Sequence, residues 1–359
     1  MVLKKPQLKK VLQDPEKAAE MAALIYITDP KLTIRRHRHG RGFYYTQNGE
    51  KIVDKSALRR FKSLAIPPAW NKVRITHLEN GHLQVVGRDA RGRKQYRYHP
   101  IWTQFRNRAK FYKMNAFGQA LPNIRKQVEQ DLELPRMTKR KCLALIIRLM
   151  EETHIRIGNE FYAKQNKTYG LSTLRTKHVK KIDQKMKFHF TGKKGKKHEI
   201  TLRNKKLQRL VLKCKEIPGW ELFQYYDEDG DKQSIDSGMV NDYIQELSGE
   251  LFSAKDFRTW SASKIFLQFL LQHECPEIDK ERSQHILEAY DFTANALGNT
   301  RNVCRKYYVH PIIPQRYQEG TLKKFLSNTP IKKTTSAFIS DTEASLLTLL
   351  DDYEVILPK

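Results

Sequence analysis

Two adjacent tyrosines, Tyr307 and Tyr308, lie late in a short basic segment at residues 299–311. A tyrosine phenol can act as a nucleophile, but its pKa near ~10 means that it must lose a proton as it attacks. We expect Gly298 to end the preceding helix, Thr300 to cap the next one and Pro311 to limit it. An arbitrary pair of tyrosines would more often serve aromatic packing or a phosphate contact, so this segment is only a candidate.

Four further segments, at residues 87–96, 155–160, 190–193 and 254–260, place arginine or lysine near glycine or aromatic residues, and a fifth, at 66–70, reads Ile-Pro-Pro-Ala-Trp. Taken singly, each arginine is typical of a solvated or salt-bridged side chain, and the lysine run at 193–197 is typical of a solvated basic turn. Taken together, the six segments resemble those of type IB DNA topoisomerases of the bacterial and poxvirus-like kind, in the order found in that family. The resemblance covers roughly residues 30–315.

The resemblance implies a role for five residues. Tyr308, nine residues after Asn299, would be the nucleophile, and Tyr307 would be a packing residue. Arg156 and Arg258 would hold the scissile phosphate, because two guanidiniums can each fork onto its non-bridging oxygens and stay charged at any working pH. Lys193 at a hairpin tip would protonate the leaving 5′-oxygen, since neighbouring cations depress the pKa of an amine.

Asn299 departs from the histidine that poxvirus and nuclear members of the family carry at this position. An amide can donate a hydrogen bond to a phosphate oxygen but cannot titrate, so we expect it to stabilise negative charge. Bacterial relatives commonly have asparagine here, which favours a bacterial source. Arg156 is expected to lie opposite the apolar stripe of a helix that begins at Thr138 and stops at Gly158.

The N-terminal third of the chain is the most basic part, with 22 Lys/Arg residues against 8 Asp/Glu in residues 1–100. Basic and aromatic side chains interleave there in a pattern that suits contacts with phosphates and with bases or sugars. The candidate DNA-binding residues are Arg88, Arg91, Arg93, Lys94, Tyr96 and Tyr98. The alternative is a basic surface strand with buried tyrosines.

The formal net charge of +28 implies a polyanionic partner, which we predict to be double-stranded DNA bound by a monomer. No GxxxxGK[ST] loop, CxxC pair or complete EF-hand loop is present, so neither a nucleotide, a metal nor another cofactor is expected. The acidic run at 227–231 and His37-Arg38-His39 are not interpreted as metal sites. We see neither a signal peptide nor an apolar run of ~18 residues, and expect a cytoplasmic protein of the bacterial nucleoid, outside the membrane.

The fold class predicted from these patterns is α+β. A small, mainly antiparallel β-rich domain at residues 1–100, with turns at Asn48-Gly49 and Asn80-Gly81, should clamp DNA against a mainly helical catalytic domain at 101–330. Alternating residues at 186–202 predict a β-hairpin in the second domain, and residues 331–359 form an acidic tail.

The predicted function is that of a type IB topoisomerase, which relaxes DNA through a 3′-phosphotyrosyl intermediate without ATP or metal. The alternative enzyme is a tyrosine recombinase, although Lys255 stands where recombinases usually have histidine. The alternative from another class is a non-catalytic architectural DNA-binding protein, which would explain the charge but not the ordered motifs.

Overall fold

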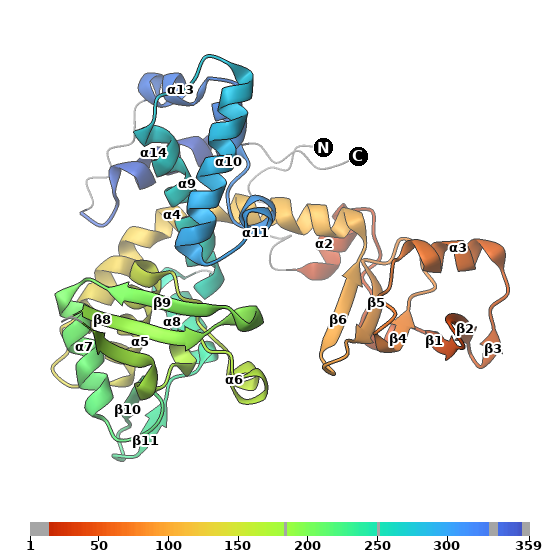
Figure 1. The fold of residues 1–359 in the computed structure, drawn as a ribbon, viewed down its shortest axis with the longest axis horizontal. Helices are drawn as coiled ribbons and strands as arrows, with labels where there is room; N and C mark the ends of the chain where they lie inside the picture. Colours follow the sequence, from red (N-terminus) through yellow and green to blue (C-terminus); the bar gives the residue numbers. More distant parts are fainter. Residues whose placement is uncertain (1–13, 183–184, 250–251, 330–336, 354–359) are drawn as a thin grey trace. The chain divides into compact units, whose positions relative to one another are not determined.

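The computed structural model describes residues 14–182, 185–249, 252–329 and 337–353 of the chain (Figure 1). The chain divides into two compact units, one running from the N-terminus to Tyr112 and the other covering Lys113–Tyr353. Helix α4 (Pro100–Leu132) begins in the first unit and continues into the second. No described helix is long and apolar enough to cross a membrane.

The first unit is built on a six-stranded antiparallel sheet in the order β3-β2-β1-β4-β5-β6 (Figure 1). Its core joins buried sheet residues such as Ile75 and Val85 to Phe61 of helix α3 (Lys55–Ser63). Asn48 and Gly49 both have positive φ and turn the chain from β2 into β3, as the sequence predicted. The strands are β1 (Ile34–His39), β2 (Gly42–Gln47), β3 (Glu50–Lys51), β4 (Asn71–Ile75), β5 (Leu83–Arg88) and β6 (Lys94–Tyr98). A small antiparallel β domain followed by helices is therefore confirmed. The short helix α2 (Pro15–Met21) precedes this sheet.

The second unit is mostly helical and contains a small antiparallel sheet in the order β7-β8-β9. Strands β8 (Lys185–Thr191) and β9 (Lys197–Leu202) pair from Met186↔Leu202 to Thr191↔Lys197, which confirms the predicted hairpin. A 3-10 turn, η4 (Lys193–Gly195), forms the basic tip. The remaining strands are β7 (Val179–Ile182), β10 (Gln224–Tyr226) and β11 (Lys232–Ser234).

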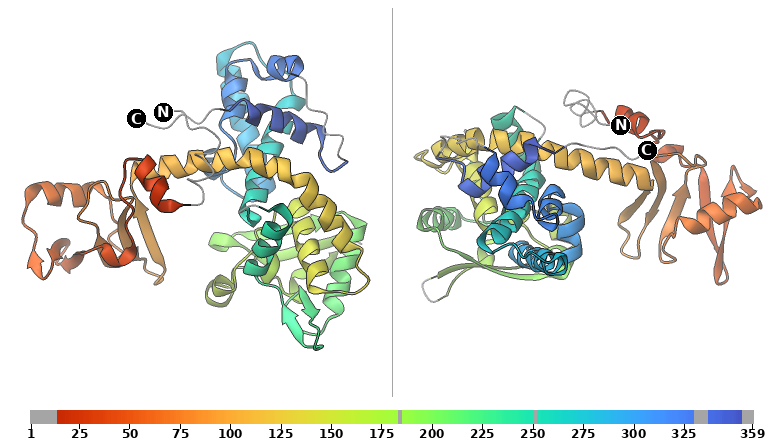
Figure 2. Two further views of the ribbon diagram at one scale, coloured as in Figure 1. Left: turned by 180° about the vertical axis from the view of Figure 1, so that it is seen from behind. Right: turned by 90° about the horizontal axis from the view of Figure 1, so that it is seen from above.

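The helices of this unit position the segments with candidate chemistry. Helices α9 (Ala254–Gln272) and α10 (Asp279–Leu297) pack against each other, and α11 (Arg301–Tyr307) packs against α10 (Figure 2). Helix α5 (Lys139–Thr153) contacts both α9 and β9. The others are α6 (Glu160–Asn166), α7 (Lys205–Glu216), α8 (Ser237–Ser248), α12 (Ile312–Gln318), α13 (Leu322–Asn328) and α14 (Asp341–Asp351).

The predicted end of the helix that begins after Thr138 was wrong. Thr138 does cap α5, but the helix ends at His154, which adopts the left-handed conformation usual for a C-terminal cap. The segment after the helix, which contains Arg156, Ile157 and Gly158, is therefore non-helical. The direction of the Arg156 side chain is not set by a position on a helix face. The apolar periodicity extended past Thr153 because Ile157 falls on the helical spacing of Leu143 and Met150, although it is half-buried and lies after the end of the helix.

The acidic segment after residue 330 includes one helix that is part of the second unit. Helix α14 packs against α9, and its first turn is closed by a capping box between Ser340 and Glu343. Glu343 is buried and contacts Arg125 and Trp260 by hydrogen bonds. The division of the chain at residues 100 and 330 stays a prediction.

Candidate active site

Arg258 lies one turn into α9, whose N-terminus is fixed by a capping box between Ser253 and Asp256. The side chain is 7% exposed, and its guanidinium donates hydrogen bonds to the backbone carbonyls of His154 and Leu297. The end of α5 and the end of α10 thus hold this guanidinium from two sides. The sequence motifs could not predict these partners, because every residue has a backbone carbonyl whatever its type.

Asn299 follows Gly298, which ends α10 in the left-handed conformation as predicted. Its side-chain oxygen accepts hydrogen bonds from Arg156 Nη2 and, at 3.2 Å, from Arg258 Nη2. The three residues that the motifs singled out from distant parts of the chain are therefore brought together. The amide nitrogen faces Cys304 Sγ at 3.8 Å, so the carbonyl oxygen rather than the amide donor faces the arginines.

Two guanidiniums that share one neutral oxygen leave an excess of positive charge at this point. Within the described residues, no carboxylate forms an ion pair with Arg156 or Arg258. Burial, together with the neighbouring charge of Arg156, lowers the pKa of Arg258 to about 10, although Tyr308 acts in the opposite direction. A bound anion would offset both the burial of the Arg258 charge and its repulsion by Arg156. The arrangement therefore suits a phosphate.

Tyr308 is the C-terminal cap of α11, and its half-buried ring lies near the guanidinium of Arg258. The guanidinium carbon of Arg258 is 5.6 Å from the centroid of that ring. Tyr307 is instead an exposed last residue of the helix, with Lys306 5.4 Å from its ring centroid. Ser263 Oγ, 3.3 Å from the carbonyl of Tyr308 and 2.9 Å from the amide nitrogen of His310, fixes the backbone after α11.

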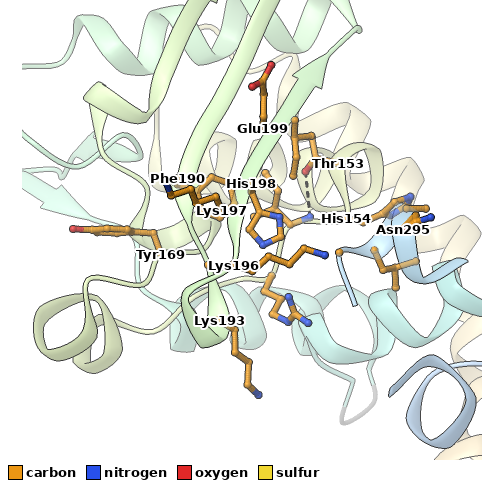
Figure 3. A pocket seen from close by; sticks show the side chains of 17 residues that line it. Thr153, His154, Tyr169, Phe190, Lys193, Lys196, Lys197, His198, Glu199 and Asn295 are labelled. Atoms are coloured by element: carbon orange, nitrogen blue, oxygen red, sulfur yellow. Dashed lines mark hydrogen bonds between the residues drawn. The ribbon is translucent and has the colours of Figure 1, made fainter. Parts of the chain in front are cut away.

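Lys193 lies on the rim of a cavity of about 220 Å³, which Arg156, His198 and Gly298 also line. Its side chain extends away from His198, whereas the side chain of Lys196 runs across the cavity (Figure 3). The structure therefore brings the hairpin tip near the arginine segment without directing Lys193 into it. His198, which also lines this cavity, belongs to none of the sequence motifs.

The candidate DNA-binding residues of the first unit lie on the β5–β6 hairpin. Tyr96 and Tyr98 stack at 6.0 Å between ring centroids, and both are 44% exposed, so they are not the buried tyrosines of the alternative interpretation. Arg93 pairs with Asp89 at 2.7 Å, and Lys94 pairs with Asp29. Arg88 and Arg91 are exposed.

Comparison with known proteins identifies the family of this chain. The family described as "Eukaryotic DNA topoisomerase I, catalytic core" matches residues 100–333, and that described as "Bacterial DNA topoisomerase IB, N-terminal domain" matches residues 42–89. DNA topoisomerase 1B of Acanthamoeba polyphaga mimivirus is 35% identical over 285 residues, which cover 77% of this chain and 84% of the viral protein. DNA topoisomerase 1B of Vaccinia virus (strain Copenhagen) is 22% identical over 263 residues, covering 72% of this chain and 80% of the viral protein.

A third relative, DNA topoisomerase 1 of Rabbit fibroma virus (strain Kasza), is 28% identical over 237 residues, covering 62% of this chain and 68% of that protein. These matches span the helical unit and reach into the β-rich one, and they describe topoisomerases rather than recombinases or architectural proteins. Because the catalytic-core family matches more than half of this chain and a relative is 35% identical to it, the chain belongs to the type IB DNA topoisomerases, enzymes of the isomerase class that act on DNA.

Proposed function

We propose that this topoisomerase cleaves one strand of duplex DNA by attack of Tyr308 on a phosphodiester held by Arg156 and Arg258. The observation that carries the proposal is the shared hydrogen-bond acceptor: two guanidiniums converge on the neutral oxygen of Asn299. Phosphate oxygens would replace or join that acceptor and would accept forked hydrogen bonds as negative charge develops.

The reaction is a transesterification. The phenolic oxygen of Tyr308 forms a bond to phosphorus, the bond from phosphorus to the 5′-oxygen breaks, and the phenolic proton passes to solvent. The product is a 3′-phosphotyrosyl ester and a free 5′-hydroxyl, and attack by that hydroxyl reverses each step. One ester replaces another at each stage, so no ATP is required, and the arginines supply the charge that a metal ion would otherwise supply.

Lys193 supplies the proton that the leaving 5′-oxygen takes up, an assignment that rests on the resemblance of the hairpin motif. Lys196 is the second candidate, because its side chain is the one that runs across the cavity (Figure 3). Both lie in or next to the tip η4, and their different directions make them separable by mutation.

The partner of the first unit is the sugar-phosphate backbone of the same duplex, contacted by Arg88, Arg91, Arg93, Lys94 and the exposed pair Tyr96 and Tyr98. The protein would act as a monomer on the nucleoid DNA of a bacterial cytoplasm. The match to a bacterial N-terminal domain and the net charge of +28 support this part of the proposal.

The test is a covalent adduct on a suicide duplex, in which the released fragment that carries the free 5′-hydroxyl is too short to remain paired. Wild-type protein should give a denaturation-resistant band on labelled DNA in the presence of EDTA and without nucleotide. Tyr308→Phe should give no band while binding DNA within a few-fold of wild type, and Tyr307→Phe should behave as wild type. Loss of the band in Tyr307→Phe but not in Tyr308→Phe would show that the nucleophile is the other tyrosine.

A further inference from the structure

His198 on β9 lies inside the cavity that Arg156 and Lys193 also line, although no motif drew attention to it. Its ring stacks on Phe190 of β8, with 5.0 Å between centroids and an interplanar angle of 15°. The stack fixes the plane of the imidazole across the hairpin. Figure 3 shows the ring next to the side chain of Lys196 and close to that of His154.

Two glycines make room for this ring from opposite parts of the chain. A Cβ atom on Gly192 would lie 2.7 Å from Cδ2 and Nε2 of His198, and one on Gly298 would lie 2.7 Å from its Cε1. Neither position can therefore carry a side chain while the ring stays in place. Gly192 immediately precedes Lys193, and Gly298 immediately precedes Asn299, so the imidazole contacts the backbone beside two proposed site residues at once.

The imidazole is surrounded mainly by cations. Burial lowers the pKa of His198, and the charges of Arg156, Lys196 and Arg258 lower it further. The other ionisable side chains that line this cavity are Lys193, Lys197, Glu199, His154 and Tyr169. A neutral flat ring can pack in such a place without adding a further positive charge to be desolvated.

We propose that His198 is a positioning residue for the cleavage step. By filling the space between Gly192 and Gly298, its ring sets the hairpin tip, and with it Lys193, at a defined distance from Asn299 and the two arginines. This inference rests on the proposed function, because it assigns His198 a task only if Lys193 protonates the leaving oxygen. A displacement of about 1 Å at a catalytic group costs on the order of 100-fold in rate, so the loss of the ring should be measurable.

The experiment compares His198→Ala, Lys193→Ala and the double variant in single-turnover cleavage of a suicide duplex at saturating protein. A second substrate carries sulfur in place of the 5′-bridging oxygen, because a thiolate leaves without a proton. His198→Ala should cleave the oxygen substrate roughly 10- to 100-fold more slowly than wild type and the sulfur substrate nearly as fast. The double variant should cleave no more slowly than Lys193→Ala alone, because both substitutions disable the same step, protonation of the leaving oxygen.

His198→Phe is the matched variant, since it keeps a flat ring on Phe190 and should retain more of the cleavage rate than His198→Ala. DNA affinity and the thermal unfolding midpoint of each variant separate positioning from a loss of fold. A His198→Ala enzyme that cleaves at the wild-type rate would contradict the role of His198 but not the proposed function. The same holds if its defect persists on the sulfur substrate while Lys193→Ala is rescued. A Lys193→Ala enzyme that is not slowed, or is slowed without sulfur rescue, would contradict the assignment of Lys193 and with it the role of His198.

Discussion

The guanidinium of Arg258 lies near the ring of Tyr308, with 5.6 Å between the guanidinium carbon and the ring centroid. The cation proposed to hold the phosphate is thus adjacent to the proposed nucleophile. Because Arg258 is buried and is held by two backbone carbonyls, its position does not depend on DNA. Such preorganisation lets a charge act on the transition state without reorganisation during the reaction.

Arg258→Ala should therefore lower single-turnover cleavage of bound DNA by roughly 100- to 1,000-fold, the usual loss for a preorganised donor. Arg258→Lys should be little better, because one ammonium cannot both donate to the carbonyls of His154 and Leu297 and fork onto a phosphate. Lys280→Ala, which removes an exposed cation from the neighbouring helix α10, is the control and should cleave nearly as wild type does. The rates come from a suicide duplex at saturating protein, and an Arg258→Lys rate within about threefold of wild type would contradict a forked contact.

Asn299→Asp should impair cleavage more than Asn299→Ala. A carboxylate in this position would pair with Arg156 and Arg258 and occupy the place where the phosphate should bind. Alanine removes one hydrogen-bond acceptor but leaves the positive charge available. Single-turnover cleavage and the binding constant for the same duplex should both fall in the order wild type, Asn299→Ala, Asn299→Asp. The reverse order for the two variants would show that the amide, and not the charge of the arginine pair, is the main attraction for DNA.

The sequence predicted the architecture well because its signals are local. Alternation at 186–202 and the pair Asn48-Gly49 depend only on near neighbours, and both hairpins are present. The motifs also identified residues that meet in space, since Arg156, Arg258 and Asn299 share hydrogen bonds across more than a hundred residues of chain. That success came from the resemblance and not from periodicity.

What could not be predicted depends on tertiary contacts. The end of α5 was misplaced, because Ile157 continues the helical spacing of apolar residues although the chain has left the helix at His154. The backbone carbonyls that accept hydrogen bonds from Arg258 could not be predicted, because the residue type does not affect the presence of a carbonyl. His198 lies five residues after Lys193, but only the fold shows that Gly298 from a distant segment closes over its ring.

Lys193→Ala should slow cleavage of an ordinary duplex strongly and recover much of the rate on a duplex with a 5′-bridging sulfur. Lys196→Ala is the matched control, because it removes the same charge from the same hairpin tip and from a side chain that runs across the cavity (Figure 3). Rescue by sulfur in Lys196→Ala but not in Lys193→Ala would transfer the general-acid role to Lys196. Equal, unrescued losses would instead indicate that both lysines act through charge alone.

Glu343→Gln should destabilise the second unit by about 3 kcal/mol at pH 7, because it breaks a buried ion pair. Burial alone would raise the pKa of Glu343, but hydrogen bonds and charge from Arg125, with help from Lys264 and Trp260, bring it down to about 2. A depressed pKa in the folded state gives stability that is complete above the ordinary value of 4.5 and is lost as pH falls toward 2. Urea unfolding of wild type and Glu343→Gln should therefore differ at pH 7 and converge between pH 4.5 and 2. Asp341→Asn, at an exposed position on the same helix, is the control and should change little, whereas a pH-independent difference would contradict the linkage.

The last prediction uses salt to separate binding of the DNA backbone from the chemistry of cleavage. Each phosphate contact releases condensed counterions, so the logarithm of the binding constant should fall with the logarithm of salt concentration at roughly −0.9 per contact. Arg91 is exposed on the β5–β6 hairpin, and Arg91→Ala should make this slope shallower by about one unit on all DNA sequences alike.

Cleavage of already bound DNA by Arg91→Ala should stay close to the wild-type rate, because Arg91 is not among the groups assigned to the scissile phosphate. Arg258→Ala should show the opposite result, with a large loss of bound-state cleavage and a modest change in affinity. Lys280→Ala, at an exposed position on α10, serves as the control and should alter neither quantity. Filter binding across a salt series measures the affinity and its salt dependence, and single-turnover cleavage measures the bound-state rate. If Arg91→Ala slowed cleavage as much as Arg258→Ala does, the first unit would have to take part in the chemistry and not only in holding the duplex.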